Sequence, residues 1–163
     1  MNCRSCSRTA FSLVEITLAL GIAGFCLIAV IGLIPTGLKT QQSSIDQGIA
    51  NGLITQIIGD LRAAFRKPGN GNSSQFGVEL KKFPPGQIQK YTPDPLYFAI
   101  DGTQENGSAT AAFRATITYY STSTTDATTT LASITISWPA TQSDLTKVAG
   151  SVQTLAVIDR KLP

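Results

Sequence analysis

Residues 16–34 of the chain read ITLALGIAGFCLIAVIGLI, and no other segment constrains the structure as strongly. These 19 residues include three glycines and one threonine but no charged side chain. At 1.5 Å of rise per residue, a helix of this length spans roughly 28 Å, close to the hydrocarbon thickness of a bilayer. The segment is too long for the apolar region of a secretory signal peptide and too uniformly apolar for an amphipathic helix. It therefore predicts a transmembrane helix.

The charges that flank this segment predict its orientation. Arg4 and Arg8 precede it, and basic residues next to a transmembrane helix favour the cytoplasmic side. We therefore expect a cytoplasmic N-terminus, with residues 39–163 across the membrane. The formal net charge is only +3, and no basic stripe with interleaved aromatic residues follows. The composition therefore gives no indication of a nucleic-acid partner.

The residue types that are missing exclude several kinds of active site and metal site. The 163 residues contain no histidine and three cysteines. The absence of histidine excludes the Ser-His-Asp triad, the Cys-His dyad and most zinc sites. Cys3 and Cys6 have CxxC spacing without a second ligand pair, and Cys26 lies inside the apolar segment. We therefore predict that the protein is not an enzyme and that it has neither a metal nor a cofactor.

Glu15 opens the apolar segment, where a carboxylate is costly unless something compensates it. It could mark the cytoplasmic edge of the membrane, at the lipid headgroups. However, the residues around it read Ala10-Phe11-Ser12-Leu13-Val14-Glu15, after a short leader with two arginines. This pattern resembles the type IV prepilin processing site, in which Phe follows a small residue and Glu is the fifth residue after the cleaved bond. Ala10 stands where that family more often has Gly.

The resemblance implies a role for each of these residues. Cleavage by a prepilin peptidase would fall between Ala10 and Phe11, the new amine of Phe11 would be methylated, and Glu15 would guide assembly. On a helix, Phe11 and Glu15 are four residues apart and share a face. The amine and the carboxylate can then neutralise each other in lipid, within one chain or between two. The implied partners are the prepilin peptidase/methyltransferase, other pilin-like subunits through the N-terminal helix, an inner-membrane assembly platform and membrane lipid.

Beyond Pro35, which is expected to kink the helix, the pattern becomes amphipathic. Apolar residues recur every four positions along one stripe: Ile45, Ile49, Leu53, Ile57, Leu61 and Phe65. Asp60 is predicted to lie on a polar face of this helix. The helix is predicted to end at Lys67, because Pro68-Gly69-Asn70-Gly71-Asn72 is a strong stop.

After this stop the apolar period changes from 3.6 to 2, which indicates strands. We expect strands over residues 76–80, 96–100, 112–120, 131–138 and 152–158, with a polar loop over 121–130. Short strands joined by turns, without crossover helices, predict an antiparallel sheet. The amphipathic stripe should cover one of its faces.

The expected fold is therefore α+β and, by the resemblance, pilin-like. A long N-terminal helix, transmembrane in its first half and amphipathic in its second, would pack on a small antiparallel sheet. We divide the chain into a prepilin leader (1–10), a transmembrane and assembly helix (11–38), an amphipathic helical half (39–67) and a β domain (68–163). A closer similarity is to the Verru_Chthon cassette protein B family. The residues that carry it are Thr17-Leu18-Ala19-Leu20-Gly21, Leu33-Ile34-Pro35-Thr36-Gly37-Leu38, Asp60-Leu61-Arg62-Ala63, Ile136-Ser137-Trp138-Pro139 and Asp159-Arg160.

The predicted function is that of a minor pilin-like or pseudopilin-like subunit. It would reside in the inner membrane with its C-terminal domain in the periplasm, and would join a type IV pilus or a type II secretion-like filament. One alternative is an unprocessed single-pass anchor that carries a binding domain. A second is a membrane-tethered enzyme, which the lack of histidine disfavours. The mature N-terminus separates the subunit from the anchor, because it would be Phe11 in the first and Met1 in the second.

Overall fold

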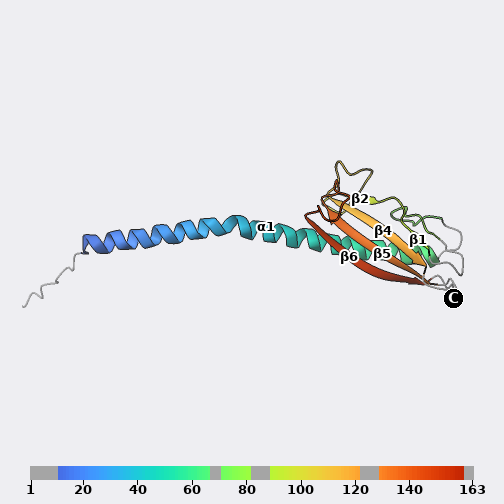
Figure 1. The fold of residues 1–163 in the computed structure, drawn as a ribbon, viewed down its shortest axis with the longest axis horizontal. Coiled ribbons are helices and arrows are strands. Elements are labelled where there is room, and N and C mark those ends of the chain that lie inside the picture. The colour runs from blue at the N-terminus through green and yellow to red at the C-terminus, as the bar shows by residue number, and fades with distance from the viewer. Residues whose placement is uncertain (1–10, 67–70, 82–88, 122–128, 160–163) are drawn as a thin grey trace, which may run out of the picture. The chain divides into compact units, whose positions relative to one another are not determined.

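The computed structural model describes residues 11–66, 71–81, 89–121 and 129–159 (Figure 1). These residues form a helix, α1 (Leu13–Arg66), and the strands β1 (Lys90–Tyr91), β2 (Leu96–Phe98), β3 (Gln104–Glu105), β4 (Phe113–Ser121), β5 (Thr129–Trp138) and β6 (Gly150–Asp159). The chain divides into two compact units, residues 1–42 and 43–163, and the second half of α1 belongs to the unit that contains the sheet.

The bounds of α1 follow from local signals. The carbonyl oxygen of Ser12 accepts hydrogen bonds from the amides of Glu15 and Ile16, at 3.0 and 3.2 Å, so Ser12 is the N-cap residue. The helix continues through Pro35 to Arg66, two residues before Pro68 of the predicted stop. Lys67, the predicted last residue of the helix, lies outside the described residues.

The strands form one antiparallel sheet in the order β3-β2-β4-β5-β6. The same side of β4 that pairs with β2 over residues 113–115 pairs with β1 over residues 119–120. Figure 1 shows β4, β5 and β6 side by side, with the second half of α1 across one face. The expected α+β architecture, with a long N-terminal helix on an antiparallel sheet, is confirmed, and it is consistent with a pilin-like fold.

The core lies between α1 and this sheet. Leu53, Ile57 and Leu61 of α1 are at most 1% exposed. The alternation predicted for residues 112–120 is confirmed, because the side chains of β4 alternate between buried and half-buried. Phe65 of α1 packs edge-on against Tyr119 of β4, with ring centroids 6.2 Å apart. The sheet side of the core consists of Phe98, Phe113, Ala115, Ile117, Tyr119, Ala132, Ile134, Ile136, Ala156 and Ile158.

The strand predicted over residues 76–80 is wrong. Phe76 and Val78 are buried as expected, but the segment is a turn with a single bridge between Asn72 and Glu79. Gly77 has a φ of 67°, in the left-handed region that a β-strand does not use. The oxygen of the Ser73 hydroxyl accepts a hydrogen bond from the Val78 amide at 2.9 Å, which closes the turn.

Two details of the predicted amphipathic helix are also wrong. Ile45 is 52% exposed, so the buried part of the stripe begins only at Ile49. Asp60, which was predicted on a polar face, is only 6% exposed. Its carboxylate oxygens accept hydrogen bonds from the backbone amides of Gln75 and Phe76, at 3.0 and 3.1 Å. These bonds join the turn of residues 73–78 to α1 and explain why a carboxylate is tolerated beside the core.

The end of β5 approaches the start of β6 closely. Trp138 is paired with Gly150, and the Trp138 indole also contacts Phe113 with ring centroids 5.9 Å apart. A Cβ atom on Gly150 would lie 2.6 Å from Cε2 of this indole and closer still to Cζ2. The missing side chain of Gly150 is therefore what lets the indole lie across β6.

Candidate functional site

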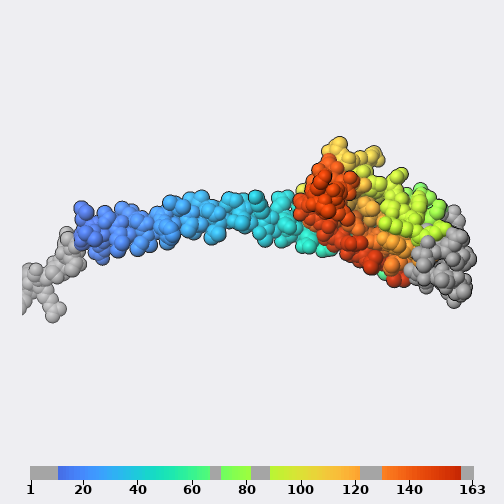
Figure 2. Space-filling view, in the orientation of Figure 1, coloured from blue at the N-terminus to red at the C-terminus, as the bar shows by residue number. Residues whose placement is uncertain are grey.

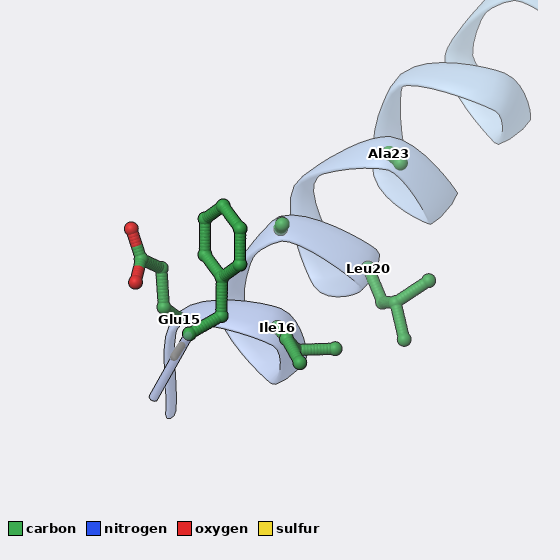
Figure 3. Close-up of a pocket in the computed structure, with 6 residues that line it drawn as sticks. Glu15, Ile16, Leu20 and Ala23 are labelled. Carbon is green, nitrogen blue, oxygen red and sulfur yellow. The ribbon is translucent and has the colours of Figure 1, made fainter. Parts of the chain in front are cut away.

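The residues at the start of α1 form the candidate site. Phe11 and Glu15 line one shallow depression together with Ile16, Ala19, Leu20 and Ala23 (Figure 3). Phe11 precedes α1, which begins at Leu13, so the two predicted site residues share this depression although only Glu15 lies on the helix. Phe11 is 76% exposed, and Glu15 is exposed as well. Ala10, on the other side of the predicted cleavage point, lies outside the described residues.

The carboxylate of Glu15 extends away from the helix axis (Figure 3). It lies in the first turn of α1, where the positive end of the helix dipole stabilises negative charge. In the described part of the chain, no cation forms a salt bridge with it. A positive group introduced near Phe11 would thus have an available carboxylate beside the same depression.

Ser12 is a site residue that the sequence reasoning missed. As the N-cap of α1 it stands three residues before Glu15, which is the spacing of a capping box. The signal was visible in the sequence, because a serine followed three residues later by Glu and then by an apolar run marks a helix start. Glu15 thus has a local structural role available in addition to the role that the prepilin resemblance implies.

The surface of α1 after Glu15 is apolar and exposed. An 18-residue window of α1 reaches a mean hydropathy of 2.6, and none of this window is buried. α1 is therefore long and apolar enough to cross a membrane, and burial in the described part of the protein does not account for its apolar half. The exposed large side chains of this half include Leu18, Leu20, Ile22, Phe25, Leu27, Ile28, Val30, Ile31, Leu33 and Ile34.

The hydroxyl groups in this half of α1 bond to the helix itself. Thr17 donates to the Val14 carbonyl at 2.9 Å, and Thr36 donates to the Leu33 carbonyl at 3.2 Å. Such back-bonding satisfies a polar group without water. These two threonines therefore carry no unmet hydroxyl donor into an apolar environment.

A polar cluster lies in the sheet unit, on the turn of residues 71–81. The Tyr91 hydroxyl donates a hydrogen bond to the Glu79 carboxylate, and the Lys81 ammonium lies 5.0 Å from the centre of the Tyr91 ring. The hydrogen bond to Glu79 is the main cause that raises the pKa of Tyr91 above its ordinary value. Among the described residues, no group of three or more His, Cys, Asp or Glu side chains could hold a metal ion. We assign this cluster to the docking of the turn onto β1.

Comparison of the chain with protein-family models, with curated proteins and with solved structures gives no match. What can be said of its function therefore depends on the site residues and on the arrangement of α1 and the sheet.

Proposed function

We propose that the protein is a minor pilin-like or pseudopilin-like subunit that a prepilin peptidase processes and that assembles through α1 into a type IV pilus or a type II secretion-like filament. Before assembly, residues 16–34 span the inner membrane, with the N-terminus in the cytoplasm and the sheet unit in the periplasm. One observation carries the proposal: Glu15, in the first turn of the unburied apolar half of α1, lines one depression with Phe11, which lies two residues before the helix begins.

The exposed apolar side chains supply the driving force for insertion into the membrane. Removing a Leu, Ile, Val or Phe side chain from water contributes about 1.5–3 kcal/mol, and this half of α1 exposes many of them. Lipid covers these side chains while the subunit waits in the membrane. In a filament, helices of neighbouring subunits replace the lipid; because lipid is as apolar as these side chains, helix packing and the pairing of Glu15 must favour this second step.

Cleavage before Phe11 makes Glu15 chemically important. The new ammonium group of Phe11 would lie at the positive end of the helix dipole, where a cation is disfavoured. A carboxylate four residues along the same side offsets this cost. If lipid surrounds the pair, leaving either charge unpaired costs more free energy than it does in water. The ammonium or the carboxylate of a neighbouring subunit can then serve as the partner.

The resemblance to the Verru_Chthon cassette protein B family supports a minor role in the assembly. The sheet unit also has no cysteine, so it cannot form the C-terminal disulfide pair that we would expect in a major adhesive pilin. The sheet unit would thus be a module that the helix displays on a filament or at its tip.

A conservative substitution separates the two roles of Glu15. Gln can replace Glu in a capping box, but it carries no charge. Glu15→Gln should therefore leave α1 intact and cleavage possible, while the subunit is lost from filaments. The matched control is Asp46→Asn, which removes a carboxylate from the second half of the same helix.

The experiment co-expresses the full chain with a prepilin peptidase and with its filament system, and follows cleavage and incorporation separately. Ala10→Leu, which enlarges the residue before the cleaved bond, should block cleavage. If the Glu15→Gln chain enters filaments as well as the wild type does, Glu15 only caps the helix. If the wild-type chain is never cleaved, the protein is an unprocessed single-pass anchor and the proposal fails.

A further inference from the structure

The two edges of the sheet differ in length and charge. At one edge, β1 and β3 have two residues each and carry Lys90 and Glu105. At the other edge, β6 has ten residues, and Gly150 to Ile158 include no ionisable side chain and no proline. Proteins usually protect an exposed edge with short strands, charges, proline or bulges. From Gly150 to Ile158, β6 has none of these, and its register with β5 is continuous, without a bulge.

The outer side of β6 offers backbone groups for pairing. Within the described parts of the chain, β5 is the only strand that pairs with β6. In an antiparallel sheet, alternate residues of an edge strand point their N–H and C=O groups away from the sheet. Figure 2 shows the atoms of β6, in red, at the surface of the sheet unit. Another extended strand can pair with these backbone N–H and C=O groups.

Two of the exposed side chains on the outer face of β6 are apolar, while Ser151 and Gln153 on the same face are polar. Leu155 and Val157 are 62% and 58% exposed and lie on the side of the sheet opposite the core. Val157 pairs with Leu131 of β5, which in turn pairs with Tyr120 of β4. An apolar row therefore runs across the outer face and ends, uncovered, at the β6 edge.

We propose that β6 pairs edge to edge, antiparallel, with β6 of a second copy of this chain. A two-fold axis centred on Ala156 pairs odd positions with odd and even with even, and places Leu155 opposite Val157 of the other copy. The core-facing Ala156 and Ile158 then extend the core face of the other copy, and Leu155 and Val157 extend its apolar row. Because β6 has no ionisable side chain from Gly150 to Ile158, this self-pairing creates no like-charge contact there. The proposal stands whether or not the leader is cleaved.

Cross-linking of the purified full-length chain in detergent tests this interface. All native cysteines are first replaced by serine, and a cysteine is then placed at position 155 by Leu155→Cys. The matched control is Ile100→Cys, since Ile100 is 60% exposed and lies in the turn between β2 and β3 at the opposite edge. Association through α1 alone would give no preference for position 155. We expect a cross-linked dimer at position 155 at least about tenfold more abundant than at position 100.

A charge at the edge supplies the second arm of the test. Val157→Lys, introduced into the Leu155→Cys chain, places like charges in the paired edge and should reduce the dimer about tenfold. Leu145→Lys is the matched control, because Leu145 is 56% exposed and lies outside β6. Equal cross-linking at positions 155 and 100, no dimer at either position, or a dimer that Val157→Lys does not reduce would each overturn the proposal.

Discussion

Replacing Asp60 by alanine should loosen the turn of residues 73–78 and destabilise the sheet unit. The Asp60 carboxylate accepts one hydrogen bond from the buried Phe76 amide and one from the half-buried Gln75 amide. A hydrogen bond to a charged group contributes about 1.5–3 kcal/mol, and the half-buried bond should be worth less because water can replace it. We therefore expect Asp60→Ala to lower the free energy of unfolding by about 3 kcal/mol.

The assay is thermal unfolding of the full chain in detergent, followed by the fluorescence of Trp138, its single tryptophan. For a unit of this size, a loss of 3 kcal/mol corresponds to a fall in Tm of roughly 10–15 °C. Asp60→Asn keeps one acceptor oxygen and should lose about half as much. Asp46→Ala, the same change elsewhere on α1, should alter the free energy of unfolding by less than about 0.5 kcal/mol.

Hydrogen exchange locates the effect. In Asp60→Ala the amides of Gln75 and Phe76 should exchange faster than in the wild type, while amides in the middle of β5 change only with global stability. If Asp60→Ala unfolds at the same temperature as Asp46→Ala, or if the two amides remain protected, the role assigned to the Asp60 carboxylate is wrong.

Two further predictions concern the sheet unit. Gly150→Ala places a methyl group against the Trp138 indole and should cost about 1–3 kcal/mol, measured by thermal unfolding; an unchanged Tm would contradict the close approach. The Thr103 hydroxyl and, as the smaller cause, the Thr103 amide donate hydrogen bonds to the Asp101 carboxylate and lower the pKa of Asp101. The stability that these bonds contribute is therefore present above the ordinary Asp pKa and is lost as the pH falls through the lowered pKa. Thr103→Val should raise the pKa of Asp101 in an NMR titration, and an unchanged pKa would refute this cause.

Features set by local spacing could be predicted from the sequence. The alternation in β4 gave the correct buried face because side-chain direction in a strand depends only on position along it. Phe11 and Glu15 also line one depression, but the helical spacing used to predict this does not apply, because Phe11 precedes α1. The described part of α1 reaches Arg66, and the predicted last residue, Lys67, lies outside the described residues.

Features set by distant backbone groups could not be predicted in this way. Asp60 lies three residues after Ile57 and one before Leu61, so its position next to the core was visible, but its polarity indicated solvent. Its hydrogen-bond partners are backbone amides 15 and 16 residues further along the chain. Because almost every residue has a backbone amide, the residue types do not indicate which amides will be the partners. The alternating residues 76–80 predicted a strand although Gly77 in the middle of them was a signal against one, since glycine readily adopts the positive φ that it has here.

The most direct test of the proposed function is the mass of the N-terminal peptide of the protein isolated from its own cells. If the chain is a processed pilin-like subunit, that peptide begins at Phe11 and carries one methyl group on its amine. A population in which residues 1–10 remain attached to every chain would contradict the proposal and identify the protein as a membrane-anchored domain.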